Sequence, residues 1–223
     1  MKRTPLRLRQ LPDYCRGEEL MNFITHTAGG GIALVLGALA IIKSALSGSS
    51  TAIVASSVYC FGMVAVYAIS SVYHGLPKGT AKKVMQIIDH CTIYALIAGS
   101  YTPVMLCAMA PRYPVLGWGM LIFQWILSAL AITFTAIDLK KYNVFSMICY
   151  IGLGWGIAPF LGQAWQVLGS GGFFWLLAGG IAYTIGTVLY GLGGKRPWMH
   201  AIFHLFVVLG TVLQWVCIFF YVL

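Results

Sequence analysis

The feature that most constrains this chain is a series of seven apolar stretches. Each is close to the roughly 20 residues that a helix needs to cross about 30 Å of hydrocarbon. The stretches cover residues 20–42, 51–74, 84–108, 114–137, 143–168, 172–192 and 199–222. Short breaks rich in glycine, proline or charge separate them, and the break at 169–172 is the weakest. We therefore predict an all-α membrane protein, a bundle of seven transmembrane helices.

Composition supports the bilayer as the solvent of this chain. Hydrophobic residues make up 60% and charged residues 9%, where a soluble chain carries about 25% charged residues. A soluble core of this length cannot bury that much apolar surface. The six cysteines form no C-x-x-C pair and five lie in apolar stretches, which favours buried thiols over disulfides or thiolate ligands.

Residues 1–19 form a basic, polar tail, and residues 20–223 form the membrane domain. The tail lacks the apolar region and the small-residue cleavage site of a signal peptide. We therefore expect the first span to act as an uncleaved anchor.

The positive charges predict the orientation. With seven spans, the tail and the second, fourth and sixth loops share one side and hold twelve of the fourteen lysines and arginines. Lys43 and Arg112 lie on the opposite side. This bias predicts a cytoplasmic N-terminus and an outside C-terminus. The net charge of +9 thus reports topology and anionic lipid headgroups, and we expect membrane lipids rather than nucleic acid as partners.

Three predicted helices bring ionisable or polar residues to one depth. His74 lies at the cytoplasmic end of the second span, and Ser70 lies one turn deeper on the same face. Asp89 falls roughly 7 Å into the third span. His200 and His204, four residues apart, share one face at the start of the seventh. All five are expected within roughly the first 10 Å of the cytoplasmic leaflet.

The chemistry that fits this layer is a zinc site. Three neutral imidazoles and a water form the open four-coordinate arrangement used for hydrolysis. Asp89 either binds the metal or serves as general base, and Ser70 orients the water or a ligand. A single histidine or serine in a membrane helix is more often an interhelical hydrogen bond than a ligand, whereas a membrane carboxylate such as Asp89 is costly and usually functional. The five residues are expected at one depth, and a carboxylate inside the membrane is too costly to be kept without a function. Together these points favour the metal site.

Other polar residues near this layer support weaker predictions. His26, with Glu19 and Asn22, could line the mouth of the site, although packing is the simpler interpretation. His90 points about 100° away from Asp89 on a helix. The segment His200–His204 lacks the glutamate of H-E-x-x-H, which argues against a zincin-type protease. No Glu-x-x-His pair supports a di-iron site.

Four motifs resemble the hemolysin III family. They are Glu19–Leu20–Met21–Asn22–Phe23–Ile24–Thr25–His26, Ser70-x-x-x-His74, Asp89–His90–Cys91–Thr92–Ile93–Tyr94 with Ala98–Gly99–Ser100–Tyr101–Thr102–Pro103, and His200–Ala201–Ile202–Phe203–His204. That family belongs with the progestin and adipoQ receptors and more distantly resembles the alkaline ceramidases. The resemblance covers the chain from Glu18 onward.

The resemblance implies a seven-helix bundle with zinc on His74, His200 and His204. Asp89 would then lie beside a zinc-bound water, with Ser70 supporting the site. The short N-terminus is similar to that of a bacterial member, which implies the bacterial plasma (inner) membrane.

Three functions remain open at this point. The first is a zinc-dependent hydrolase acting on a lipid amide or ester near the cytoplasmic headgroup–acyl boundary. The second is a sensor or receptor of membrane lipids in which zinc is structural. The third, a cytolytic pore, is poorly supported because no charged stripe could line a pore. Gly152-x-x-x-Gly156 is weak evidence for a homo-oligomer.

Overall fold

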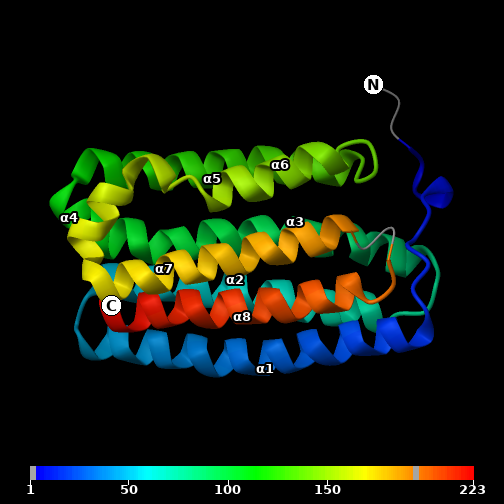
Figure 1. The fold of residues 1–223 in the computed structure, drawn as a ribbon, viewed down its shortest axis with the longest axis horizontal. Coiled ribbons are helices and arrows are strands. Elements are labelled where there is room, and N and C mark those ends of the chain that lie inside the picture. Colours follow the sequence, from blue (N-terminus) through cyan, green and yellow to red (C-terminus); the bar gives the residue numbers. More distant parts are fainter. Residues whose placement is uncertain (1–3, 193–195) are drawn as a thin grey trace.

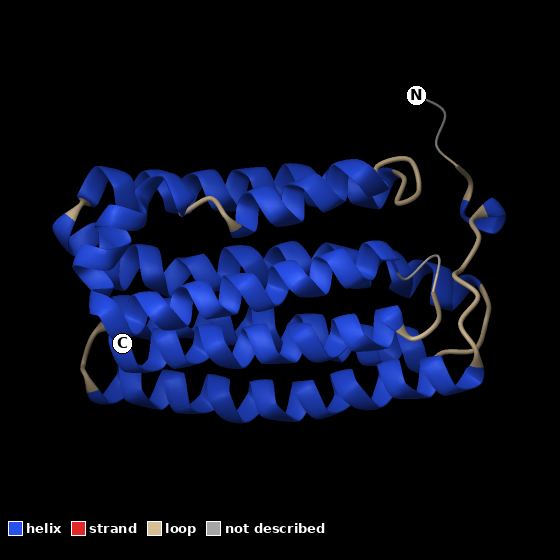
Figure 2. Cartoon of the chain, viewed as in Figure 1, coloured by secondary structure: helices blue, strands red, loops and turns tan. Residues whose placement is uncertain are grey.

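The computed structural model describes residues 4–192 and 196–223, and these residues form an all-helical bundle without strands (Figures 1 and 2). Within them, six helical stretches are long and apolar enough to cross a membrane. They are Arg16–Leu46, Ser50–Gly75, Thr80–Arg112, Pro114–Ile137, Asn143–Leu192 and Met199–Tyr221. The chain is therefore a multi-pass membrane protein, as its composition predicts.

The long helices run along a common axis (Figure 1). They are α1 (Arg16–Leu46), α2 (Ser50–Gly75), α3 (Thr80–Pro103), α5 (Pro114–Ile137), α6 (Asn143–Gly154), α7 (Leu161–Leu192) and α8 (Met199–Tyr221). Shorter elements are η1 (Leu6–Leu8), η2 (Val104–Met109), α4 (Ala110–Arg112) and η3 (Ala158–Phe160). Helix α1 packs on α2 and α8, α2 packs on α3, and α7 packs on α8.

The stretch predicted as one helix at 84–108 changes its winding partway. Helix α3 ends at Pro103, and the following residues, Val104–Met109, form a π-helix. Proline has no backbone N–H and its ring crowds the carbonyl four residues earlier, so regular α-helical bonding is interrupted there.

The predicted spans 143–168 and 172–192 are separated at Gly169, and the first of them is also interrupted earlier. Helix α6 already ends at Gly154, and a short 3₁₀ turn containing Pro159 leads into α7. Helix α7 consists of two helical stretches that meet at Gly169, where φ is 65° and ψ is 178°. The expected break at 169–172 therefore begins at a kink in the structure. Figure 1 shows α6 and α7 running in opposite directions, with the chain turning near α4.

The N-terminal tail crosses the end of the bundle at which α1 and α8 begin (Figure 1). The Thr4 backbone N–H donates to Asp138 Oδ2 at 2.9 Å. Arg9 Nη2 donates to the Ile137 carbonyl at 2.8 Å. Both acceptors lie where α5 ends, so the described part of the tail is fastened across the bundle end.

Candidate metal centre

Glu18 joins the first turns of α1 and α8. Its Oε2 accepts the Cys15 N–H at 3.0 Å and completes a capping box at the start of α1. Its Oε1 accepts the Trp198 N–H at 2.6 Å. Trp198, which precedes α8, has a φ of 66°, a strained value for an aromatic residue. This junction fixes the position of Glu19 along the bundle axis relative to that of His200.

Three buried imidazoles meet at this end of the bundle. His200 Nε2 and His204 Nε2 are 3.1 Å apart, as expected for two histidines on one helix face. The ring of His74, on α2, lies 5.3 Å from that of His200 and 5.1 Å from that of His204, between centroids. One ligand atom from each residue lies within 4.8 Å of the others. The three histidines could therefore hold a metal ion.

The donor atoms of this group fit a metal ion. His74 Nε2 is buried and has no hydrogen-bond partner among the residues that the structure describes, which is costly unless the atom binds something. Two imidazole nitrogens at 3.1 Å either share one proton or both direct lone pairs at a cation. A set of three neutral imidazoles is typical of zinc and of other first-row metals.

Ser70 and Asp89 line a cavity that two of these histidines also line. Both are buried, and together with His200 and His204 they line one cavity of about 140 Å³. Asp89 Oδ2 lies 3.4 Å from Nδ1 of the adjacent His90. The catalytic and supporting roles assigned to Asp89 and Ser70 stay predictions.

His26 and His90 border the same cavity without joining the three histidines that could hold a metal. The ring of His26 stacks on that of His204 with centroids 3.6 Å apart. His90 Nδ1 donates to the Gln86 carbonyl at 2.8 Å, and its Nε2 is 3.0 Å from the Tyr190 hydroxyl. His90 is therefore engaged with α3 and α7.

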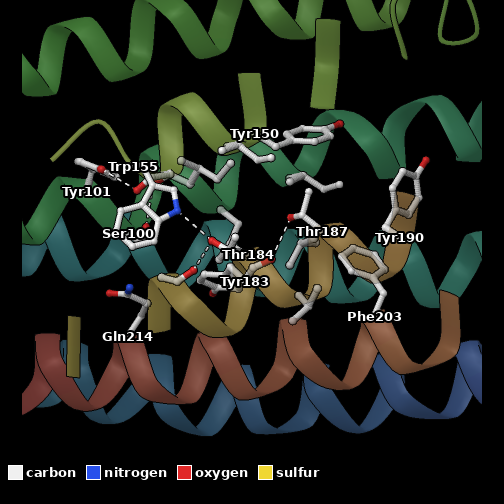
Figure 3. A pocket seen from close by; sticks show the side chains of 18 of the residues that line it. Ser100, Tyr101, Tyr150, Trp155, Tyr183, Thr184, Thr187, Tyr190, Phe203 and Gln214 are labelled. Carbon is white, nitrogen blue, oxygen red and sulfur yellow. Dashed lines mark hydrogen bonds between the residues drawn. The ribbon is translucent and has the colours of Figure 1, made fainter. Parts of the chain in front are cut away.

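The cavity extends from the histidines into the bundle as far as Gln214, which is ten positions after His204 on α8, a rise of about 15 Å. Figure 3 shows polar side chains along its wall. The polar groups of these side chains form hydrogen bonds within the protein. Trp155 Nε1 donates to Thr184 Oγ1 at 2.9 Å, and Gln214 Nε2 donates to the Leu176 carbonyl at 3.0 Å. The surface offered to a ligand is consequently largely apolar.

Two residues beside the histidines were not singled out from the sequence as part of the site. The ring of Tyr14, in the tail, stacks on His200 with centroids 5.0 Å apart, and burial raises the pKa of Tyr14. In the sequence, Lys82 serves only as one of the positive charges that predict the orientation in the membrane. In the structure its side chain is buried, with 3% of the residue exposed. Its spacing of seven residues from Asp89 places both on one face of α3, a signal that could have revealed it.

The chain matches the family model described as Haemolysin-III related over residues 15–215. It belongs to the haemolysin III family. It is 37% identical to Hemolysin-3 of Bacillus cereus over 206 residues, 92% of each chain. It is 35% identical to the Hemolysin-3 homolog of Bacillus subtilis (strain 168), over 92% of this chain and 94% of the relative.

A more distant relative of this chain is the human monocyte to macrophage differentiation factor. It is 28% identical over 158 residues, which cover 67% of this chain and 63% of the relative. No solved structure matches the chain. The resemblance to the hemolysin III family that the motifs indicated is thus confirmed by the two Bacillus relatives, each of which aligns over 92% of this chain.

Proposed function

We propose that this protein is a zinc-dependent membrane hydrolase that cleaves a lipid amide or ester near the cytoplasmic headgroup–acyl boundary. The observation that carries the proposal is the junction of the histidine group with an apolar cavity. His200 and His204 line the wall of a cavity that continues about 15 Å into the bundle. A site at this position could receive the polar group of a lipid at the imidazoles and its chain in the cavity.

The proposal includes seven crossings of the bacterial inner membrane. It is supported by the turn between α6 and α7 and by the kink at Gly169 within the 50-residue stretch Asn143–Leu192. Figure 1 draws the end of α8 opposite the end that the tail crosses, as an odd number of crossings requires. The charge bias then makes the histidine end cytoplasmic.

Zinc held by His74, His200 and His204 would supply a Lewis acid and lower the pKa of water. Asp89 is the proton acceptor of the proposed site, because its carboxylate borders the same cavity as two of the imidazoles. The Ser70 hydroxyl, on the same wall, orients the reacting polar group by a hydrogen bond. The apolar lining keeps bulk water away from the acyl chain.

The test is product analysis on zinc-loaded protein reconstituted with mixed bacterial lipids and an N-acylated sphingoid lipid. We expect released fatty acid, a loss of turnover in His200→Ala, and a drop of about 10²–10⁴-fold in Asp89→Asn. Asp138→Asn, which changes a carboxylate outside the spans, should keep turnover within a few-fold.

Full turnover in Asp89→Asn would overturn the proposed mechanism. Absence of turnover on every lipid, combined with a melting temperature that falls on chelation, would favour the sensor with a structural zinc. Ion conductance in bilayers containing the protein would instead support the pore that the name of the Bacillus cereus relative suggests.

A further inference from the structure

His74 is held on one side by a carboxylate. Glu19 Oε2 lies 2.7 Å from His74 Nδ1, and the His74 side chain is fully buried. An ionised carboxylate only accepts hydrogen bonds, so Nδ1 carries the proton and Nε2 carries the lone pair. The Asn22 amide nitrogen is also near Nδ1, at 3.4 Å, but the shorter contact with Glu19 decides the tautomer.

The free nitrogen of His74 is the one that the metal requires. Within residues 4–192 and 196–223, no hydrogen-bond partner reaches the buried His74 Nε2, and His74 belongs to the group of three histidines that could hold an ion. The Glu19 carboxylate therefore contacts Nδ1, on the side of the imidazole ring opposite to the free Nε2. Such a carboxylate–histidine pair fixes the ring orientation of a metal ligand and raises its basicity.

Glu19 is itself held by a buried lysine. Lys82 Nζ lies 2.9 Å from Glu19 Oε1 and donates to the carbonyls of His74 at 3.2 Å and Leu76 at 3.0 Å. The three N–H groups of the ammonium thus have three oxygen partners. Two of these are carbonyls at the C-terminus of α2, where a cation is favourable. Lys82, from α3, consequently ties Glu19 of α1 to the end of α2.

We propose that Glu19 is a positioning residue that presents His74 Nε2 to the metal, and that Lys82 holds Glu19 in place for this task. This inference rests on the metal site of the proposed function, and it extends that site to charges on α1 and α3. Glu19 and Lys82 act through His74 and touch neither substrate nor metal.

The test measures metal affinity and ligand field separately from activity. Zinc dissociation constants are determined by competition with a chromogenic chelator, and the visible d–d spectrum is recorded for the cobalt(II) form. In Glu19→Ala we expect zinc affinity to fall about 10–100-fold and the cobalt spectrum to change. Glu19→Gln, whose amide oxygen can still accept the Nδ1 proton, should fall in between. Lys82→Met should weaken zinc binding in the same direction.

Matched controls come from neighbouring charges. Asp13→Asn removes an exposed carboxylate paired with Lys78, and Lys83→Met removes the lysine adjacent to Lys82. Both should bind zinc as the wild type does. If Glu19 merely joined helices, the melting temperature of the metal-free protein would fall while affinity and cobalt spectrum stayed unchanged.

Two outcomes separate this inference from the proposed function. Wild-type zinc affinity in Glu19→Ala and Glu19→Gln, together with lost binding in His200→Ala, would overturn the positioning role and leave the metal site standing. Equal zinc binding by the wild type and His200→Ala would overturn the site itself. If Glu19→Ala does not fold, the zinc affinity and the cobalt(II) spectrum of Glu19→Gln and Lys82→Met test the same inference.

Discussion

Gly62 controls the distance between α2, which carries Ser70 and His74, and α3, which carries Asp89. A Cβ atom built on Gly62 would lie 2.7 Å from the Ala95 backbone carbonyl oxygen. Because the obstacle is backbone, the two helices would have to move apart. The relative position of the Asp89 and His74 side chains therefore depends on this residue, although Gly62 itself lies far from the histidines along α2.

We predict that Gly62→Ala destabilises the protein by about 1–3 kcal/mol, the usual cost of overpacking. The same change at Gly31, where no atom of the described chain lies within 4 Å of the added carbon, is the matched control and should be nearly neutral. Thermal unfolding in detergent measures both. Equal melting temperatures for the two variants would contradict the close approach of α2 and α3.

Asp138 fastens the tail through its charge. Hydrogen bonds from Thr4, and then one from the Lys141 N–H, hold the pKa of Asp138 at about 2. Since this pKa is depressed below the ordinary value of 3.8, the stabilisation is fully present above about pH 4. It is lost as the pH falls from about 4 towards 2.

The matching measurement compares the wild type with Asp138→Asn. The variant should melt at a lower temperature at pH 7, and the difference should shrink as the pH falls from about 4 towards 2, where the wild-type carboxylate becomes protonated. A difference that stays constant over this range would show that the charge of Asp138 is not what holds the tail.

At the scale of elements, the tail covers the histidine centre. Tyr14 stacks on His200 and lies with its ring centroid 6.1 Å from that of His74. The tail is fastened by polar contacts such as the exposed pair Lys78–Asp13, whose charged atoms are 2.7 Å apart. Exposed ion pairs contribute little to stability, so this pair adds little to holding Tyr14 over the histidines.

We predict that Tyr14→Ala speeds the loss of zinc to a chelator. An aromatic stack is worth about 0.5–1.5 kcal/mol, which corresponds to roughly two- to tenfold in rate. Tyr14→Phe keeps the ring and should lose zinc at the wild-type rate. Stopped-flow competition gives both rates, and identical rates in the alanine variant would exclude Tyr14 as a cover.

The kink in α7 depends on Gly169. Its φ of 65° and ψ of 178° lie in a region that is essentially restricted to glycine. We predict that Gly169→Ala lowers the free energy of unfolding by about 1–3 kcal/mol. Gly162→Ala is the control, because the added carbon meets no atom of the described residues within 4 Å. An unchanged melting temperature in Gly169→Ala would show that α7 can be straight at this position.

At the scale of the whole molecule, the charge bias and the positions of the two chain ends together predict that the N-terminus and the C-terminus lie on opposite sides of the membrane. A reporter fused before Met1 should be cytoplasmic and one fused after Leu223 should be outside, because seven crossings place the ends on opposite sides. Protease or thiol-reagent access to the two reporters in intact cells measures this. Both reporters on the same side would show an even number of crossings.

Much of this molecule is readable from local patterns. The lengths of the apolar stretches locate most helices to within a few residues, since the bilayer demands both length and apolarity. The spacing of His200 and His204 places them on one face, because a helix repeats every 3.6 residues. These properties were determined by the sequence itself.

Tertiary structure decided what local patterns do not encode. The free nitrogen of His74 depends on Glu19, which is 55 residues away in the chain. Lys82 is buried because its three oxygen partners converge only when α1, α2 and α3 pack. Such contacts join segments distant in sequence, so the protonated atom and the buried charge are set by packing, whereas the helices that carry them are set by composition.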